Sequence, residues 1–454
     1  MQNKVFHLVL GPLLFGLVYI LLPSTFTFEM RNSAGIMAWM LSWWLTEVVP
    51  MAITALLPIL IFSATKILTL DACYKGYSDR FVFLFLGGFL LSLTFEKSGL
   101  HRVLAKKILN KSGNSNRSVL FAFMITTYII SMWISNTATA IMMMPLAAGV
   151  IHLFPKDQHF HRNLVLGIAY SASIGGMATL MGSPPNAAAA GILSSNFGIE
   201  VSFLTWIKWG LPFSLVLLFI GYLILSRHMP KVFRSHNIIE HELNLNQNLL
   251  SNHQKRTLGI FIAVCLCWIF QAGLSVFIGD WFNDTAIALI FASLLFVSFN
   301  NDPLLRWEDT AQLPWGILLM FGGGLTMASG LKEAGWMNWL GNVFAAWNYG
   351  QSSLLVLIVG ISILLTALMS NLAMVAVFIP IVAQIATELN YPILGLAIPV
   401  ALASSCDFMF PMSTPPNAIA YSSGHVTASQ MFKIGFLVNV AAFILLIVWM
   451  TVMH

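Results

Sequence analysis

Charged residues are scarce in this sequence, because only 9% of its 454 residues are Asp, Glu, Lys or Arg. A soluble protein of this length carries about a quarter of such residues, so we expect lipid to solvate most of this chain. Hydrophobic residues make up 58%. Long apolar runs recur at 5–22, 203–226, 257–274 and 430–453. Each run is close to the roughly 20 residues that a helix needs to cross a membrane.

These apolar runs are continuous and lack the alternation of apolar and polar residues that membrane barrels show. Inside a bilayer the backbone polar groups must bond to one another, which leaves helices and closed barrels as the spanning structures. The sequence therefore predicts an all-α polytopic membrane protein. We expect a retained first helix and its loop at 1–33, because the apolar run after Lys4 has no small-residue cleavage site of a signal peptide.

Other signals of chemistry are missing. No nucleotide-binding motif such as a P-loop is present, so the sequence does not indicate an activity driven by ATP. The four cysteines provide no disulfide framework, and Cys265 and Cys267 are interpreted as packing residues. His152, His159 and His161 crowd one loop, for which we favour a solvated loop over a metal site. The net charge of +5 reflects basic loops and not nucleic-acid binding.

The sequence contains an internal repeat. Its longest polar stretch, 227–256, is interpreted as a cytoplasmic linker between two hydrophobic halves, 34–226 and 257–454. Four landmarks of the first half recur in the second half in the same order, at offsets of 231 to 236 positions. They are the Gly-Gly segments at 86–100 and 322–336, the pairs Ser135-Asn136 and Ser370-Asn371, the residues Pro145 and Pro380, and the motifs GSPPNA at 182–187 and STPPNA at 413–418.

The charges that flank equivalent segments indicate that the two repeats have opposite orientations. The stretch 337–353 contains no Lys or Arg, whereas the equivalent stretch 101–117 contains Arg102, Lys106, Lys107, Lys111 and Arg117. Positive residues near the ends of transmembrane helices stay in the cytoplasm. The same loop is thus predicted inside in one half and outside in the other, as in the inverted-topology repeats of many secondary transporters.

Each Ser-Asn pair lies near the middle of an apolar segment, 118–154 in the first half and 353–389 in the second half. We interpret each segment as a helical hairpin with the polar residues at its tip, either as re-entrant half-helices or as two tight full spans. A single Ser-Asn pair in a membrane helix commonly forms hydrogen bonds between helices. Two matched pairs at hairpin tips favour a binding function instead.

The paired prolines of GSPPNA and STPPNA stop a helix, because they remove two backbone donors. Broken helices are tolerated at membrane depth only where they are buried in protein or line a cavity. Free carbonyl groups together with Ser, Thr and Asn oxygens would suit Na⁺. The N-termini of the following helices would present amide donors and a positive dipole to an anion. A kink without any ligand is the alternative.

Four stretches together resemble the divalent anion/Na⁺ symporter family, the INDY-type dicarboxylate transporters. They are SMWISNTATAIMMMPLA at 131–147, GIAYSASIGGMATLMGSPPNA at 167–187, MFGGGLT at 320–326 and STPPNAIAYSSGHV at 413–426. The resemblance extends over nearly the whole chain. It implies about 11 transmembrane helices and two re-entrant hairpins in two inverted repeats. It also implies a homodimer in the bacterial plasma membrane, elevator-type movement, and coupling of Na⁺ to small anions such as succinate, malate, fumarate, citrate or sulfate.

The same resemblance implies two Na⁺ sites and a substrate site made of neutral oxygen and amide groups. One Na⁺ site is expected at Ser131, Ser135, Asn136 and the backbone of Gly182, and the other at Thr366, Ser370, Asn371 and the backbone of Ser413. Substrate carboxylates would meet Asn136, Thr137, Ser183, Ser370, Asn371 and Thr414. Since these residues include no Lys or Arg, bound Na⁺ would supply much of the charge that balances a dianion.

Two residues depart from the family pattern. Leu372 stands where the pattern has threonine, so one substrate-facing hydroxyl is missing, and Asp407 stands where a small or apolar residue is usual. An intramembrane carboxylate is costly and by default functional. We interpret Asp407 as a proton-coupling group, an extra cation ligand or a partner for a positive substrate group, or else as a protonated side chain away from the site. Both departures would weaken binding of a compact dicarboxylate.

The sequence thus predicts a Na⁺-coupled secondary symporter, most concretely for C4 dicarboxylates. The alternatives are an anion exchanger or channel of the same fold, a transporter of sulfate, a tricarboxylate, a monoanion or a zwitterion, and H⁺ coupling through Asp407. A membrane-embedded enzyme is not favoured, since the other intramembrane charges have no His or Asp companion at catalytic spacing. The adjacent charges Glu96-Lys97 and Lys332-Glu333 are interpreted as local ion pairs.

Overall fold

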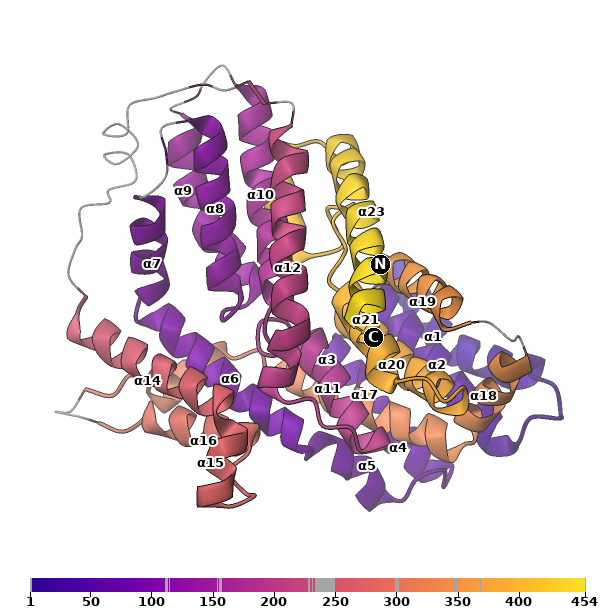
Figure 1. Cartoon of the computed structure of the whole chain (residues 1–454). Coiled ribbons are helices and arrows are strands. Elements are labelled where there is room, and N and C mark those ends of the chain that lie inside the picture. Colours follow the sequence, from indigo (N-terminus) through magenta and orange to yellow (C-terminus); the bar gives the residue numbers. More distant parts are fainter. Residues whose placement is uncertain are drawn as a thin grey trace.

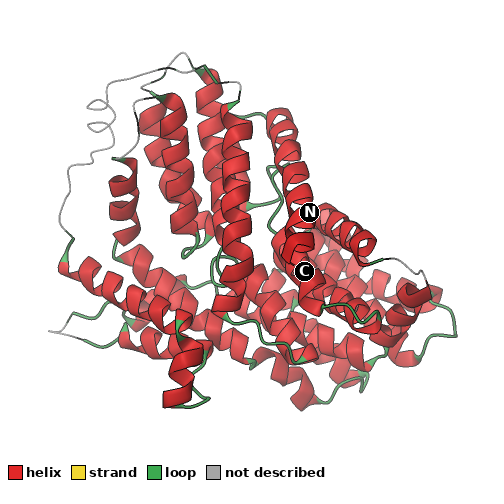
Figure 2. Ribbon diagram, in the orientation of Figure 1, coloured by secondary structure: helices red, strands yellow, loops and turns green. Residues whose placement is uncertain are grey.

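The computed structural model describes residues 2–110, 113, 115–152, 154, 157–227, 229–230, 232, 250–298, 302–346, 350–367 and 369–453. Over this part of the chain the fold is helical and contains no strand (Figure 2). The prediction of an all-α protein is therefore confirmed. Most of the linker predicted at 227–256 lies outside the described residues, as does Lys111.

The helices before the linker are α1 (Gln2–Leu21), α2 (Phe28–Thr46), α3 (Met51–Thr54), α4 (Leu57–Ala64), α5 (Leu70–Tyr77), α6 (Arg80–Lys97), α7 (Leu100–Leu109), α8 (Asn116–Ser131), α9 (Asn136–Ile151), α10 (Gln158–Met177), α11 (Pro184–Phe197) and α12 (Phe203–Ser226). The helices after it are α14 (Asn252–Ile269), α15 (Gln271–Ile278), α16 (Asp284–Leu294), the 3₁₀ helix η1 (Trp307–Gln312), α17 (Trp315–Glu333), α18 (Trp336–Ala346), α19 (Gln351–Thr366), α20 (Asn371–Glu388), α21 (Ile393–Ala403), α22 (Pro415–Ser422) and α23 (Ala428–Met453).

Among the described residues, five helical segments are long and apolar enough to cross a membrane, namely Lys4–Leu21, Leu70–Lys97, Phe203–Ser226, Asn371–Glu388 and Ala428–Val452. Helices α14 and α15 would together make a sixth, although the chain bends by 83° between them. Other apolar helices, including α9, α16, α19 and α21, have only 10–17 residues. The predicted number of about 11 transmembrane helices is therefore not confirmed, because breaks in the chain divide several apolar runs into short helices.

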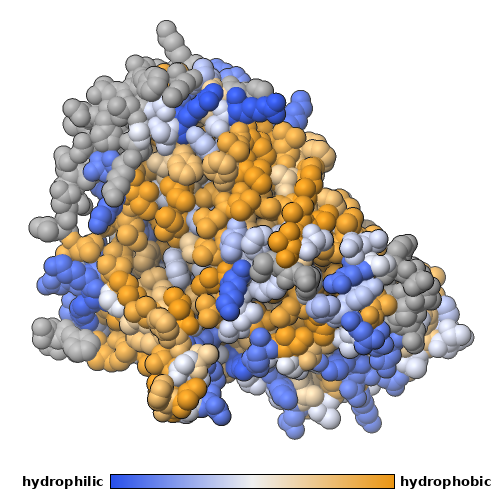
Figure 3. Space-filling model, in the orientation of Figure 1, coloured by the Kyte–Doolittle hydropathy of each residue, from blue (hydrophilic) through white to orange (hydrophobic). Residues whose placement is uncertain are grey.

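Large apolar side chains cover the outer surface of the molecule. Ile20 on α1 and Val452 on α23 are each 74% exposed. Figure 3 shows a broad hydrophobic area across this face, with hydrophilic residues mostly toward its edges. A surface of this kind is compatible with lipid chains and unfavourable in water, as expected for an integral membrane protein.

Two helix pairs, α8–α9 and α19–α20, occupy the segments predicted as hairpins. Ser135 and Ser370 accept hydrogen bonds from the backbone N–H groups of Ala138 and Ala373, at 3.2 and 3.3 Å, so each serine caps the second helix of its pair. Helices α8, α9 and α19 have 16 residues each and are about 24 Å long. They are shorter than the hydrocarbon core of about 30 Å, which favours the re-entrant form for the α8–α9 pair. In the other pair, α20 has 18 residues and is itself one of the helices long enough to cross a membrane.

The paired prolines start two further helices. Helix α11 begins at Pro184 and α22 begins at Pro415. Proline fits the first turn of a helix because the N–H group that it lacks would have no partner there. The preceding helices, α10 and α21, end at Met177 and Ala403, so a non-helical break separates each of them from the helix that follows.

The two halves of the chain cross at these short helices. Helix α11 of the first half packs along α20 of the second half, and α22 of the second half packs against α9 and α10. Each hairpin also packs on a helix of its own half, α8 and α9 on α10, and α19 and α20 on α21. Figure 1 shows α8, α9, α10 and α12 side by side. Each half therefore contributes a broken helix to the hairpin of the other half.

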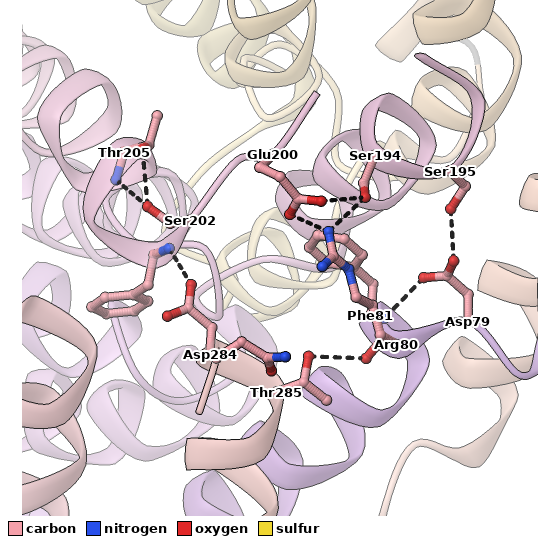
Figure 4. Close-up of polar contacts among 12 residues, drawn as sticks. Asp79, Arg80, Phe81, Ser194, Ser195, Glu200, Ser202, Thr205, Asp284 and Thr285 are labelled. Carbon is pink, nitrogen blue, oxygen red and sulfur yellow. Dashed lines mark hydrogen bonds and ion pairs between the residues drawn. The ribbon is translucent and has the colours of Figure 1, made fainter. Parts of the chain in front are cut away.

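A polar network joins the ends of α6, α11, α12 and α16 (Figure 4). The guanidinium of Arg80 pairs with the carboxylate of Glu200. Asp284 accepts a hydrogen bond from the backbone N–H of Phe203 at 2.7 Å, and Thr285 donates one to the carbonyl of Arg80 at 3.3 Å. The network links helices of both halves through partners that are far apart in the sequence.

The adjacent charges at the ends of α6 and α17 do not pair with each other. Lys97 forms an ion pair with Asp309 in η1, and Lys332 donates a hydrogen bond to the carbonyl of Asn196 at 2.7 Å. Side chains that are neighbours in the sequence of a helix point in different directions. The prediction of local ion pairs is therefore wrong.

Candidate functional site

The residues predicted for the first cation site gather where the α8–α9 turn meets the break between α10 and α11. The fully buried hydroxyl of Ser131 lies 2.8 Å from Asn136 Oδ1 and 2.7 Å from the carbonyl oxygen of Ala172, so it can donate to either acceptor. Asn136 lies against Gly176, where a Cβ would come within 2.5 Å of Asn136 Oδ1. A Cβ on Gly182 would in turn come within 2.7 Å of the Gly176 carbonyl oxygen.

The second half has the same arrangement. Thr366 Oγ1 lies 2.9 Å from Asn371 Oδ1 and 2.5 Å from the carbonyl oxygen of Ser404, at the end of α21. The hydroxyl of Ser413 lies 2.8 Å from the carbonyl oxygen of Asp407. Each half thus presents one hydroxyl and one carboxamide beside a break in a helix.

Two buried asparagines that sequence reasoning did not single out hold these breaks together. Asn186 donates hydrogen bonds to the carbonyl groups of Gly176 and Thr179, both at 2.8 Å. Asn417 bonds to two carbonyl groups of the other break, at 2.9 and 3.1 Å. The expectation that the carbonyl groups of the breaks are free is therefore wrong for these four groups. Both asparagines stand in the repeated PPNA sequence, which was the available signal.

Several buried acceptors remain without a partner beside these contacts. They are Oδ1 of Asn186, Oδ1 of Asn417 and both carboxyl oxygens of Asp407, which accept no hydrogen bond of ordinary geometry from a described residue. A buried polar group without a partner is costly, and hard cations in proteins take oxygen ligands of these kinds. The residues present in both halves thus fit a hard monovalent cation such as Na⁺.

A cavity of about 920 Å³ opens onto the residues of the first half. Its walls come mainly from α6, α7, α9 and the segment before α17, and Ser135, Thr137 and Gly182 line it. The predicted substrate residues Asn371 and Thr414 do not contribute to its walls. Ser131, Asn136 and Ser183 of the first half do not line it either, and nor does Ser370 of the second half. The cavity therefore reaches the tip of the first hairpin and Gly182, but it does not join the predicted substrate residues of both halves.

Helix α7 gives this cavity a basic side. Arg102 and Lys106 line the cavity together with Glu96 from the end of α6. Burial lowers the pKa of the neighbouring His101, the hydrogen bond with the Phe95 carbonyl opposes this effect, and Arg102 lowers the pKa further. The neutral form of His101 is therefore favoured, and two cationic side chains face one carboxylate.

Position 372 breaks the match between the hairpin tips. Thr137 in the first turn of α9 lines the cavity. Its counterpart Leu372 in the first turn of α20 is buried, with 7% of its surface exposed. The second tip therefore offers an apolar side chain where the first offers a hydroxyl.

His159 and His161 lie in the first turn of α10 and not in a loop, so the prediction of one solvated loop is wrong for these two residues. His161 also has a partner from the second half. The ring of His161 lies 5.5 Å from the ring of His425, edge to face, and His425 belongs to the connection between α22 and α23. Within the described part of the chain, no group of three or more His, Cys, Asp or Glu side chains could hold a metal ion.

A family model described as the sodium:sulfate symporter transmembrane region matches residues 2–453. The chain belongs to this family. Two relatives, from Staphylococcus saprophyticus and Staphylococcus aureus, are both named sodium-dependent dicarboxylate transporter SdcS. The chain is 33% identical to the first over 467 residues, which cover 97% of this chain and 89% of the relative. It is 35% identical to the second over 477 residues, which cover 98% and 90%. The resemblance inferred from the motifs is confirmed.

Two solved transporter structures have a similar fold. The YdaH transporter of Alcanivorax borkumensis has a TM-score of 0.55 and 13% identity, over 99% of this chain and 97% of that protein. MtrF of Neisseria gonorrhoeae, described with a class of antimetabolite efflux pumps, has a TM-score of 0.57 and 13% identity, over 99% and 94%. At such identities the similarity supports the fold alone.

Proposed function

We propose that this protein is a Na⁺-coupled secondary symporter that moves small dicarboxylates across the bacterial plasma membrane. Its family and its SdcS relatives, which match nearly the whole chain, are transporters and not enzymes. The observation that carries the proposal is the matched pair of contacts Ser131–Asn136 and Thr366–Asn371, each beside a break in a helix. Two such oxygen clusters suit two small cations better than they suit a purely structural role.

Each cluster offers oxygen ligands for one Na⁺. The proposed ligands are Ser131, Ser135, Asn136 and the Gly182 backbone in the first half, and Thr366, Ser370, Asn371 and the Ser413 backbone in the second half. When bound, Na⁺ supplies positive charge beside the substrate. The residues themselves keep the geometry, because the carboxamides of Asn186 and Asn417 hold both breaks in shape.

The anion would be recognised by hydroxyl and amide donors at the starts of four helices. The proposed substrate residues are Asn136, Thr137, Ser183, Ser370, Asn371 and Thr414. Helices α9, α11, α20 and α22 all begin at or beside these residues, so the positive ends of their dipoles favour a negative ligand. Since these side chains are neutral, substrate affinity should depend on Na⁺.

The cavity would give the anion a route to the first tip. Arg102 and Lys106 line the same cavity as Thr137, and a basic wall raises the local concentration of a dianion. We extend the proposal to an elevator movement of the hairpins and broken helices within a homodimer. These two features rest on the family resemblance and on the crossing of the two halves.

Uptake into proteoliposomes tests the proposal. Labelled succinate should accumulate when an inward Na⁺ gradient is present, and should not accumulate when K⁺ or choline replaces Na⁺. A panel of citrate, sulfate and sulfonates then defines the anion class, with empty liposomes as the control. Succinate uptake that is the same with Na⁺ and with choline would contradict the proposal.

Transport of a different anion by the same fold is the second candidate function, and Leu372 is the observation that favours it. An apolar tip removes one donor to a carboxylate, and each hydrogen bond to a charged group is worth about 1.5–3 kcal/mol. The variant Leu372→Thr should therefore lower the KM for succinate about tenfold if succinate lies against this tip. Leu365→Thr, near the end of α19, is the matched control. If Leu372→Thr has the same KM for succinate and the same order of preference among anions as the wild type, this tip does not determine the anion selectivity.

A further inference from the structure

Asp407 has in the second half the position that Gly176 has in the first half. Each of these residues stands ten positions before an asparagine, Asn417 or Asn186, whose carboxamide bonds to its carbonyl oxygen. The two breaks thus share one hydrogen-bond pattern and differ by one carboxylate at a matched place.

The position shared by Gly176 and Asp407 lies beside the contact between a hydroxyl group and an asparagine in each half, namely Ser131–Asn136 and Thr366–Asn371. In the first half an added Cβ at Gly176 would come within 2.5 Å of Asn136 Oδ1. In the second half the side chain of Asp407 interacts with the side chain of Asn371, the counterpart of Asn136. Asn371 Oδ1 lies 2.9 Å from Thr366 Oγ1. The carboxylate therefore adjoins the second oxygen cluster directly.

Asp407 is buried without a counter-ion. It is 1% exposed, and neither carboxyl oxygen accepts a hydrogen bond of ordinary geometry from a described residue. None of the ion pairs among the described residues includes it. The polar groups that α20, α22 and α23 bring to this break are the neutral amides of Asn371, Asn417 and Asn439. An unpaired carboxylate is among the most costly groups to bury, so this one must be neutralised by a proton or by a cation. The oxygen atoms of Thr366 and Asn371 beside it supply further ligands for a cation.

We propose that the Asp407 carboxylate is a direct ligand of the Na⁺ held in the second half, an inference that rests on the Na⁺-coupled function proposed above. The ion, together with Asn371 and Thr366, satisfies the carboxyl oxygens and neutralises their charge. The second site then carries a formal negative charge, whereas the first site is built from neutral groups. Na⁺ binds more tightly in the second half for this reason.

Thermal unfolding of the purified protein without substrate provides a binding readout that does not depend on transport. The melting temperature is measured against Na⁺ concentration, with choline replacing Na⁺ at constant ionic strength. The variants are Asp407→Asn and Asp407→Gly, the second of which copies Gly176. Asp284→Asn is the control, because Asp284 is a half-buried carboxylate that belongs to the network at the start of α16 and lies outside the proposed site.

Two changes are expected in both Asp407 variants. The Na⁺ concentration for half-maximal stabilisation should rise by about tenfold or more, and the Na⁺-free protein should melt higher than the Na⁺-free wild type, because an unpaired buried charge has been removed. Asp284→Asn should retain the wild-type Na⁺ dependence. Na⁺ curves in the Asp407 variants that match the wild type would overturn the inference. A wild type that Na⁺ stabilises no more than choline would instead contradict the Na⁺-coupled function itself.

Discussion

Asn186 and Asn417 each connect the first turn of a short helix to carbonyl groups across a break of the chain. Their carboxamides replace the backbone donors that a continuous helix would have supplied. The breaks can therefore stay open inside the membrane without unsatisfied carbonyl groups. The hydroxyl and amide groups beside them keep fixed positions as a result.

Replacing either asparagine by alanine should destabilise the protein. Each substitution leaves two buried carbonyl groups without their donor, which costs about 1–3 kcal/mol for an unsatisfied group. The free energy of unfolding in detergent measures the loss. Asn196→Ala, near the end of α11, serves as the control, because the Asn196 carboxamide accepts one hydrogen bond from Ser329 at 3.3 Å and bonds to no carbonyl group of a break. It should destabilise the protein less than either of the two substitutions. If Asn186→Ala and Asn417→Ala are as stable as this control, the two carboxamides do not hold the breaks.

The sequence was sufficient to group Ser131 with Asn136 and Thr366 with Asn371, which the structure places in contact, but not to show how the breaks beside them are held. Ser131 and Asn136 are five positions apart, and the turn between them follows from one apolar hairpin, so their contact could be expected. The bond from Asn186 to the Gly176 carbonyl depends on the path of the chain through the break. Spacing alone does not specify that path, and the same limit applies to the pairing of Lys97 with Asp309.

Helix α7 combines a buried side with a basic side. Leu100, Ala105 and Leu109 are buried, whereas Arg102 and Lys106 line the cavity that contains Thr137. The helix thus covers apolar side chains and places two cations along the route proposed for the anion.

Arg102→Gln should raise the KM for a dianion on the side of the membrane to which this cavity opens, by about three- to tenfold at low ionic strength. The effect should shrink as salt is added, because salt screens the charge. Transport assays on vesicles of both orientations measure it. Lys107→Gln on the same helix is the control, since Lys107 is exposed and does not line the cavity. Equal KM values for the two variants at low salt would exclude a steering role for Arg102.

The contact between the start of α10 and the α22–α23 connection should make stability depend on pH. Burial lowers the pKa of His425, and His161 and His152 lower it further. The unfolded chain then takes up a proton at a higher pH than the folded protein, so stability falls as pH decreases through and below the ordinary value of about 6.5. His425→Gln should reduce the drop in melting temperature between about pH 7.5 and 5.5. His159→Gln is the control, and an equal reduction in this variant would mean that the contact is not responsible.

At the scale of helices, the positions of the two hairpins could be predicted from the sequence, whereas the number of transmembrane helices could not. A polar tip in the middle of an apolar segment fixes where two helices meet, and Ser135 and Ser370 both cap a helix there. The apolar runs elsewhere carry Gly and Pro residues whose effect depends on neighbouring helices. The 83° bend between α14 and α15 falls at Phe270, where there is neither Gly nor Pro, and hydropathy does not reveal it either.

The whole molecule joins two similar halves whose broken helices cross. Helix α11 packs along α20, and α22 packs against α9, so each hairpin contacts the break of the other half as well as its own. A displacement of one hairpin would therefore carry elements of both halves with it. This arrangement is consistent with the proposal that the hairpins and broken helices move as one unit.

The central claim is that Na⁺ binding at two matched sites drives accumulation of a dicarboxylate. The most direct test is the steady-state ratio of internal to external succinate in proteoliposomes, measured as the Na⁺ gradient is varied at a clamped membrane potential. This ratio should rise at least as the square of the Na⁺ ratio, because each site contributes one ion per substrate. Succinate that accumulates to the same ratio at every Na⁺ gradient, or only in exchange for an internal anion, would contradict it.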